Sequence, residues 1–355
     1  MIKVFDIQVV EFNLISEITN KKNINLQKCL KLISEKEARD LLPKKSKITV
    51  QFKLENTNSD IANGIRRCLI DEIEVKSFDF DEYKDFQSSD PYILSDFIKK
   101  QVCLLPIDQE FNYDGIIIKL EKTNTTDEII DVLSDDFILS GSATQKDLDQ
   151  IIGKNIVLTR LRPGENITIN NIVICSDVAY KDAGKYSLLS NVTYEILDMD
   201  PIVETKLGKT GKSSLVSNPT HFSIKYTTHR NIQHPLKIMV TCCDTLIKRL
   251  DAIYNDMLNI RDTDITYFSN LLTLETSGNI HKIQIRDEYW TIINLICRYC
   301  YILASDIKFV SPSLIHPEKH IGVINITHPE FSTLIQKSIK KIIVEFEIIK
   351  QAFYK

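Results

Sequence analysis

The sequence predicts an α+β protein made of two related half-domains that form an internal pseudo-dimer, with a β-rich insertion in the first of them. The first observation is a unit of alternating strand, polar turn and apolar helix that occurs at 47–73 and again at 280–305. The second is a pair of long segments, 236–260 and 331–353, whose apolar residues repeat about every 3.5 positions. The third is a run of short strand-like segments between 78 and 219, which indicates the insertion.

These observations divide the 355 residues into three parts, a number of domains that suits the length of the chain. The first half-domain is discontinuous and comprises residues 1–78 and 220–262. The insertion comprises residues 79–219, and the second half-domain comprises residues 263–355. Hydrophobic residues make up 43% of the chain and charged residues 26%, which is typical of a globular protein with real cores.

Composition and charge exclude several classes of protein. A formal net charge of −4 argues against a protein that coats nucleic-acid phosphates over its whole surface. No stretch of about 18 residues is uniformly apolar, so no membrane-spanning helix is expected, and the start of the chain lacks the features of a signal peptide. The eight cysteines lack the spacing of a disulfide framework, so we expect a soluble protein of a reducing compartment.

The first half-domain begins with an alternating strand at 2–12. A helix is predicted at 25–42, where apolar residues recur at near-helical spacing before a proline ends it. Residues 47–56 alternate again and predict a half-buried strand. Asn58 or Ser59 can then cap a helix. The apolar side of that helix is formed by residues four positions apart, namely Ile61, Ile65, Leu69 and Ile73.

The insertion consists of strand-like runs separated by polar turns. The clearest runs are GIIIKL at 115–120, NIVLTRL at 155–161 and NITINNIVIC at 166–175. The insertion closes with residues 204–218, which are dense in Lys, Gly, Ser and Thr and therefore predict a loop.

The second half-domain repeats the order of the first. Aligning IANGIRRCLI with the later IINLICRYCY places Asn63 on Asn294 and Arg67 on Arg298. The long helix that follows in each half has a narrow apolar seam, which requires a partner helix. Each helix would be about 35–40 Å long, so the two are similar enough in length to pack along each other. We therefore expect them to pair within one chain, and no self-dimer is expected. The residues predicted to make this internal pairing are Leu246, Leu250, Ile253, Met257, Ile339, Ile342, Phe346 and Ile349.

The segment 206–213 offers an alternative function, a nucleotide-binding enzyme. Its final Gly-Lys-Ser matches the end of a phosphate-binding loop. That motif also needs an earlier glycine, where Lys206 stands, and a helix after it, whereas Pro219 follows here. A flexible basic loop is therefore the preferred interpretation.

Two other candidate sites are better explained by structure. Cys297 and Cys300 lie one helical turn apart on an apolar face without a second pair nearby, which favours core packing over a metal or redox site. His316 and His320 are spaced for a metal on a helix, but the proline between them predicts a turn. No nucleophile elbow or Gly-rich dinucleotide turn occurs, so no catalytic residue, metal site or cofactor is expected in this chain.

The adjacent arginines Arg66 and Arg67 allow three interpretations. They can be a solvated helix face, a nucleic-acid patch or a surface that another protein binds. Both flank the apolar stripe of a helix that follows a half-buried strand. The planar guanidinium fork of arginine suits carboxylates and carbonyls on a partner protein.

The sequence around these arginines resembles a known family, the assembly subunit of multisubunit RNA polymerases. That family comprises bacterial alpha, archaeal D and the third-largest subunit of eukaryotic polymerase II. The resemblance lies in NTNSDIANGIRRCLIDEI at 56–73 and DPYILSDFIKKQVCLLPI at 90–107, and also in LRPGENITI and DTLIKRLDAI. The positions that match the family's Asn-x-x-Arg-Arg helix and its later Leu-Pro are Asn63, Arg66, Arg67, Leu105 and Pro106.

The last third resembles the family's smaller partner, archaeal L or the eleventh subunit of polymerase II. The matching text is LTLETSGNIHKIQIRDEYWTIINLICRYC, then HPEKHIGVINI and the final helix. One polypeptide that carries both parts is similar to the fused subunit of large cytoplasmic DNA viruses. Two departures stand out, because the cysteine-rich metal loop of many D-type subunits is missing and Cys297 replaces an arginine usual in the smaller partner.

The resemblance implies a non-catalytic platform on which the two large catalytic polymerase subunits assemble. It implies that Asn63, Arg66 and Arg67 contact the large subunit that corresponds to bacterial beta. It implies small polymerase assembly subunits as further partners, and contact with DNA and RNA only through the complex. It also implies that the protein is located in the virion and in the virus factory of the host cytoplasm. A free-standing homodimeric interaction protein with the same fold is a further alternative.

Overall fold

The computed structural model describes most of the chain, namely residues 2–12, 47–153, 155–198, 219–229 and 233–354. Two predictions lie outside these described residues. They are the helix at 25–42 and the loop at 204–218, which includes the whole candidate nucleotide segment 206–213.

The first sheet is antiparallel and has the order β1-β2-β11-β10. Its strands are β1 (Lys3–Phe12), β2 (Lys47–Glu55), β11 (His221–His229) and β10 (Ser190–Ile196). The predicted strand at 47–56 is therefore confirmed as β2. Its alternation buries one face completely, because Val50, Phe52 and Leu54 have no exposed surface.

The helix after β2 begins where the sequence predicts. Helix α4 (Ser59–Arg67) is capped by Asn58, whose Oδ1 accepts hydrogen bonds of 3.0 Å from the backbone N–H groups of Asp60 and Ile61. The helix continues as a π-helical turn, η1 (Cys68–Glu72), which places Glu72 in the interior. A long helix, α9 (Pro235–Met257), packs beside these elements.

The second sheet is also antiparallel, with the order β12-β13-β14-β16-β15. Its strands are β12 (Thr266–Phe268), β13 (Leu272–Ser277), β14 (Ile280–Arg286), β16 (Ile321–Thr327) and β15 (Phe309–Leu314). Two helices belong with it, α10 (Trp290–Leu303) and α11 (Phe331–Ala352). The predicted strand, turn and apolar helix at 280–305 are thus confirmed as β14 and α10.

The third sheet has the order β3-β9-β5-β7, and a small separate ribbon pairs β6 with β8. Its strands join residues far apart, because β3 pairs with the distant β9. The strand β10, although it falls within 79–219, pairs with β11 of the first sheet. The elements of this region are β3 (Glu74–Asp79), β4 (Phe86–Ser88), α5 (Ser95–Cys103), β5 (Ile116–Thr123), β6 (Ile130–Leu133), β7 (Phe137–Gly141), α6 (Leu148–Ile151), β8 (Val157–Leu161), β9 (Asn166–Val178) and α7 (Ala179–Asp182).

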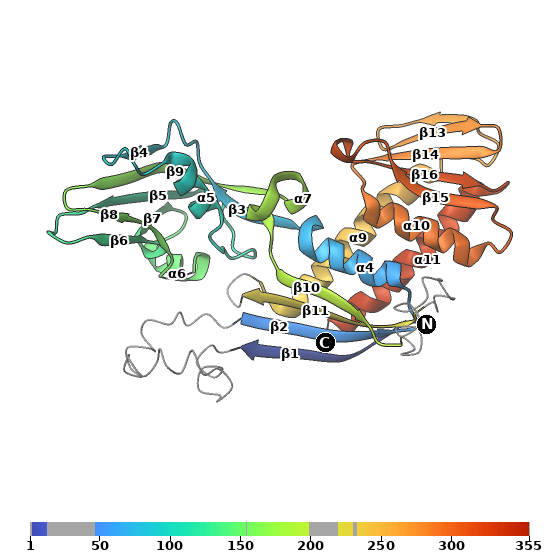
Figure 1. The fold of residues 1–355 in the computed structure, drawn as a ribbon, viewed down its shortest axis with the longest axis horizontal. Coiled ribbons are helices and arrows are strands. Elements are labelled where there is room, and N and C mark those ends of the chain that lie inside the picture. The colour runs from blue at the N-terminus through green and yellow to red at the C-terminus, as the bar shows by residue number, and fades with distance from the viewer. Residues whose placement is uncertain (1, 13–46, 154, 199–218, 230–232, 355) are drawn as a thin grey trace, which may run out of the picture.

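Buried hydrophobic side chains form two clusters among the described residues. One cluster is shared by the first and second sheets and by helices α4, α9, α10 and α11, which lie between those sheets in Figure 1. The other belongs to the third sheet and its surroundings, from Phe78 to Ile172. The chain is therefore a mixed α+β protein with antiparallel sheets, as its sequence predicts.

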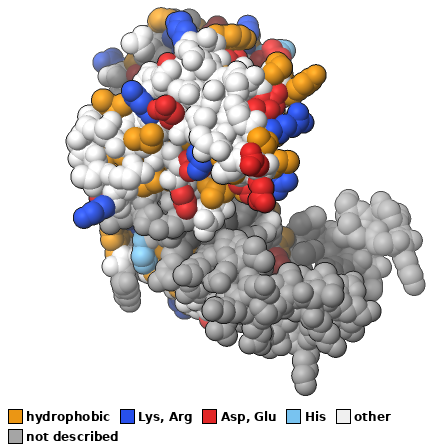
Figure 2. Space-filling model, turned by 90° about the vertical axis from the view of Figure 1, so that its left-hand side faces the viewer, with side chains coloured by type: hydrophobic (Ala, Val, Ile, Leu, Met, Phe, Trp, Pro, Cys, Tyr) orange, Lys and Arg blue, Asp and Glu red, His pale blue; other side chains and the backbone are white. Residues whose placement is uncertain are grey.

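The end of the molecule that carries the third sheet faces the viewer in Figure 2. On its described part, acidic and basic side chains are interspersed with hydrophobic ones, and no single sign of charge dominates this face. Among the described residues, no helix combines the length and the apolar character needed to cross a bilayer.

Candidate functional site

Helices α9 and α11 pack against each other in opposite directions. Lys350, near the end of α11, lies with its Nζ 2.6 Å from Oδ1 of Asp244 in the first half of α9. At the other end, Gln336 donates a hydrogen bond of 2.9 Å to the backbone oxygen of Met257. The eight residues predicted for internal pairing are all at most 1% exposed, namely Leu246, Leu250, Ile253, Met257, Ile339, Ile342, Phe346 and Ile349.

A second contact joins α4 to α10. Gly64 faces Leu295 so closely that a Cβ added to the glycine would lie 3.3 Å from the leucine Cδ1. Arg67, at the end of α4, donates from Nε to Oγ1 of Thr291 at the start of α10, over 2.9 Å. Arg298, farther along α10, has its Nε 3.7 Å from Oδ2 of Asp60 at the start of α4. The two helices therefore also run in opposite directions.

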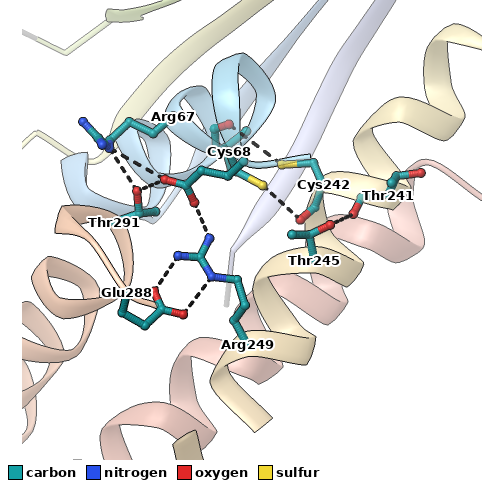
Figure 3. A network of polar contacts seen from close by, with 10 residues as sticks. Arg67, Cys68, Thr241, Cys242, Thr245, Arg249, Glu288 and Thr291 are labelled. Carbon is teal, nitrogen blue, oxygen red and sulfur yellow. Dashed lines mark hydrogen bonds and ion pairs between the residues drawn. The ribbon is translucent and has the colours of Figure 1, made fainter. Parts of the chain in front are cut away.

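A buried ion network lies where these helices meet (Figure 3). Arg249 of α9 donates from Nε to Oε1 of Glu288 over 2.8 Å and from Nη2 to Oε2 over 2.5 Å. Its Nη1 donates to Glu72. Both glutamates are only 5% exposed. One guanidinium thus joins a carboxylate that ends the α4–η1 segment to a carboxylate that precedes α10.

Burial and charge act on the pKa values of this network in opposite directions. Burial raises the pKa of the Glu288 carboxyl above its ordinary value, although Arg249 lowers it in part. Burial lowers the pKa of Arg249, but the carboxylates of Glu288 and Glu72 outweigh this and hold it above its ordinary value. Arg249 therefore keeps its positive charge, which compensates the two buried carboxylates.

Thr291 connects this network to Arg67. Its hydroxyl donates to Glu72 and accepts the hydrogen bond from Arg67 Nε. The Nε of Arg67 is itself 3.9 Å from Glu72 Oε1, beyond hydrogen-bond distance. The Cζ atom of Arg67 lies 5.9 Å from the ring centroid of Tyr289, close enough for a cation–π contact. The side chain of Arg67 is 24% exposed.

The other two residues predicted for partner binding lie on the same helix. Asn63 and Arg66 are half-buried, and Arg66 donates from Nε to Oδ1 of Asn63 over 3.0 Å. The structure thus brings Asn63 and Arg66 together, whereas Arg67 turns one edge toward Thr291. Four further residues of the network were not predicted from the sequence, namely Glu72, Arg249, Glu288 and Thr291. No local pattern marks them, because their partners lie far away in the chain.

A second, partly buried polar chain links the start of α4 to α10 and α11. The amide of Asn58 donates to the hydroxyl of Tyr299 over 3.1 Å, and that hydroxyl donates to Glu345 of α11. Burial raises the pKa of the Glu345 carboxyl. The cap of α4 is thereby tied to both helices of the second sheet.

The cysteines predicted to pack in the core lie there. Cys297 and Cys300 are buried free thiols on α10, and burial raises the pKa of Cys300 to about 11. A thiol of such high pKa is a poor nucleophile and metal ligand near neutral pH. His316 and His320 flank a short 3-10 turn between β15 and β16. Within the described ranges, no group of three or more His, Cys, Asp or Glu side chains could hold a metal ion.

Comparison with known proteins gives relatives along nearly the whole chain. The chain is 25% identical over 321 residues to the "DNA-directed RNA polymerase RPB3-11 homolog" of African swine fever virus from a Namibian warthog isolate, covering 86% of this chain and 87% of that protein. It is 25% identical over 337 residues to the same protein of a Kenyan pig isolate, with 90% of each chain covered. A tick isolate from Malawi gives 24% identity over 340 residues and the same coverage.

No protein-family model matches the chain. The alignments with the Kenyan and Malawian relatives nevertheless leave out only about a tenth of either protein. Taken with the fold, this makes the chain a homologue of the viral DNA-directed RNA polymerase RPB3-11 proteins over about nine tenths of its length.

Proposed function

We propose that this chain is a non-catalytic assembly platform of a viral DNA-directed RNA polymerase, with two alpha-subunit-like half-domains fused in one polypeptide. The observation that carries the proposal is the similarity to RPB3-11 homologs along about 90% of both chains. Fusion makes the pairing of the halves intramolecular, which reduces the entropy cost of association. A monomeric chain is expected, because each half already has its partner.

The contacts between α4 and α10 support an internal pseudo-dimer. In a two-fold pairing, a contact between two positions occurs twice with the roles exchanged. The alignment that places Arg67 on Arg298 also places Asp60 on Thr291. The contact of Arg67 with Thr291 then corresponds to the contact of Arg298 with Asp60. Gly64 falls on Leu295 and touches it, as residues at a pseudo-two-fold axis do.

The contacts between α9 and α11 support the same arrangement. Matching the two apolar seams places Asp244 on Lys340 and Tyr254 on Lys350. The ion pair of Asp244 with Lys350 then corresponds to the contact of Lys340 with Tyr254, in which Nζ lies 4.9 Å from the ring centroid. In both pairs of helices the contacts recur with the roles exchanged, and this supports the proposed pseudo-two-fold relation.

The division into two half-domains and an insertion is part of this proposal. The hydrophobic cluster of the third sheet is separate from the one that the paired helices share, which suits an inserted domain within 79–219. Small polymerase assembly subunits are proposed as further partners, with DNA and RNA reached only through the complex. Transcription in the host cytoplasm and presence in the virion are proposed from the viral relatives.

We infer that Asn63, Arg66 and Arg67 form the surface for a large catalytic subunit. Arg66 and Arg67 are the last two residues of α4, Asn63 lies at its middle, and all three keep some exposure. An arginine has five N–H donors, so Arg67 can hold Thr291 with Nε and still offer donors to a partner carboxylate.

The test is recovery of the two large polymerase subunits with a tagged chain from infected or reconstituting cells. Changing Arg66→Ala and Arg67→Ala together should reduce that recovery by roughly tenfold or more, because arginines that anchor interfaces are worth at least ~1.4 kcal/mol. The control is Arg160→Ala with Arg162→Ala, two exposed arginines of the third-sheet region, which should change nothing. Equal recovery with all chains would mean that Arg66 and Arg67 belong to a solvated helix face. Failure to recover any large subunit with the unchanged chain would refute the platform.

A further inference from the structure

We propose that Thr291 positions Arg67, so that the surface for the large subunit is complete only when the two half-domains are paired. Thr291 belongs to the second half-domain and Arg67 to the first. The inference rests on the proposed function, because it concerns the same surface. It adds that a residue distant in the chain, which need not touch the partner, decides whether Arg67 is available to that partner.

Arg67 is held from the second half-domain by two residues at the start of α10. Thr291 accepts the hydrogen bond from its Nε over 2.9 Å, and the ring of Tyr289 lies 5.9 Å from its Cζ. The Glu72 carboxylate, which belongs to its own half-domain, is 3.9 Å from Nε and makes no hydrogen bond with it. Figure 3 shows the Arg67 side chain next to Thr291, on the side of the network away from Arg249.

Glu72 competes for Arg67. The turn η1 directly follows α4, so the arginine and the buried carboxylate stay close neighbours whether or not the second half-domain is present. A shift of less than 1 Å would bring Nε of Arg67 into a direct hydrogen bond with Glu72, from the present 3.9 Å. An ion pair of that kind, drawn into the interior, would take the guanidinium away from an outside partner.

Two donors occupy the oxygens of Glu72; the second half-domain provides one of them and fixes the position of the other. Thr291 donates its hydroxyl to one carboxylate oxygen, and Arg249 donates to the other. Arg249 is in turn fixed by two hydrogen bonds to Glu288 of the second half-domain. With both oxygens of Glu72 occupied, Arg67 remains at the surface with donors to spare.

The surroundings of Arg67 also come from separate parts of the chain. His320, in the β15–β16 turn, lies between Tyr289 and Tyr180 of α7, with ring centroids 5.6 and 5.4 Å away. Tyr289 therefore contacts both the guanidinium of Arg67 and the ring of His320. A partner segment with a carboxylate beside apolar side chains fits such a surface, which the first half-domain alone does not possess.

The test uses the full chain with Thr291→Val, which keeps the shape of the side chain and removes its hydroxyl. We expect recovery of the large subunits to fall severalfold, as far as with Arg67→Ala alone, while Thr291→Ser retains recovery because it keeps the hydroxyl. Thermal unfolding of each chain alone identifies any variant that fails to fold. If the valine variant fails, Thr291→Ala takes its place.

A double-mutant cycle separates positioning from a general structural effect. If Thr291 acts through Arg67, then Thr291→Val adds no further loss to a chain that already carries Arg67→Ala. An additional loss would overturn the proposal, and so would full recovery with Thr291→Val alone. Failure of the proposed platform function gives a different result, because in that case even the unchanged chain recovers no large subunit.

Discussion

Replacing Arg249 with methionine is expected to lower the free energy of unfolding by about 3–5 kcal/mol, because it leaves two buried carboxylates without their cation. Glu72 and Glu288 are each only 5% exposed, and Arg249 is the guanidinium that contacts both. The measurement is chemical denaturation of the purified chain. An exposed arginine, Arg160→Met, is the control and should change the free energy by less than about 0.5 kcal/mol.

The loss should depend on pH. Burial already raises the pKa of Glu288, and removal of Arg249 raises it further. The native state of the variant then binds this proton more tightly than the unfolded chain, so its stability falls as the pH rises. The deficit relative to the unchanged chain should be smaller near pH 5 than near pH 7.5. A deficit that is the same at both pH values would contradict the assignment of the loss to buried carboxylates.

Removing all three charges should be far less harmful than removing one. The triple change Glu72→Met, Arg249→Met and Glu288→Leu leaves no unpaired buried charge, and such replacements are often neutral or stabilising. If the triple variant is as unstable as Arg249→Met, packing around the arginine stem and not charge compensation is the main contribution of this residue.

Phe346→Ala is expected to cost about 3–5 kcal/mol, because it opens a cavity in the seam between α9 and α11. The side chain of Phe346 is completely buried and lies in the cluster that the first and second sheets share with the helices between them. The matched control is Val344→Ala on the same helix, where the valine is 53% exposed. Denaturant unfolding monitored by circular dichroism measures both variants, and a loss no larger for Phe346→Ala than for the control would contradict pairing through this seam.

Local patterns in the sequence predicted the regular elements well. Alternation predicted β2, and Asn58 was one of two candidates for the cap of α4. The 3.5-residue seams predicted long helices at 236–260 and 331–353, and the structure contains α9 and α11 there. Such patterns are readable because the side chains that form one face of an element are close together in the sequence.

Two features that depend on distant residues were not predicted. Sheet membership is one, since β10 lies inside 79–219 but pairs with β11, and no local signal specifies that neighbour. The polar network is another, because Arg67 and Thr291 are 224 residues apart and Arg249 and Glu72 are 177 apart. In the sequence, Glu72 and Glu288 look like any other acids. Their burial and their shared guanidinium follow only from the crossing of α4, α9 and α10.

Native mass spectrometry of the complex purified through a tagged chain tests the central claim most directly, since it counts subunits. We expect one copy of this chain together with two large polymerase subunits, because a single polypeptide supplies both halves of the platform. Two copies of the chain in each complex, or a chain that associates with no large subunit, would contradict the account.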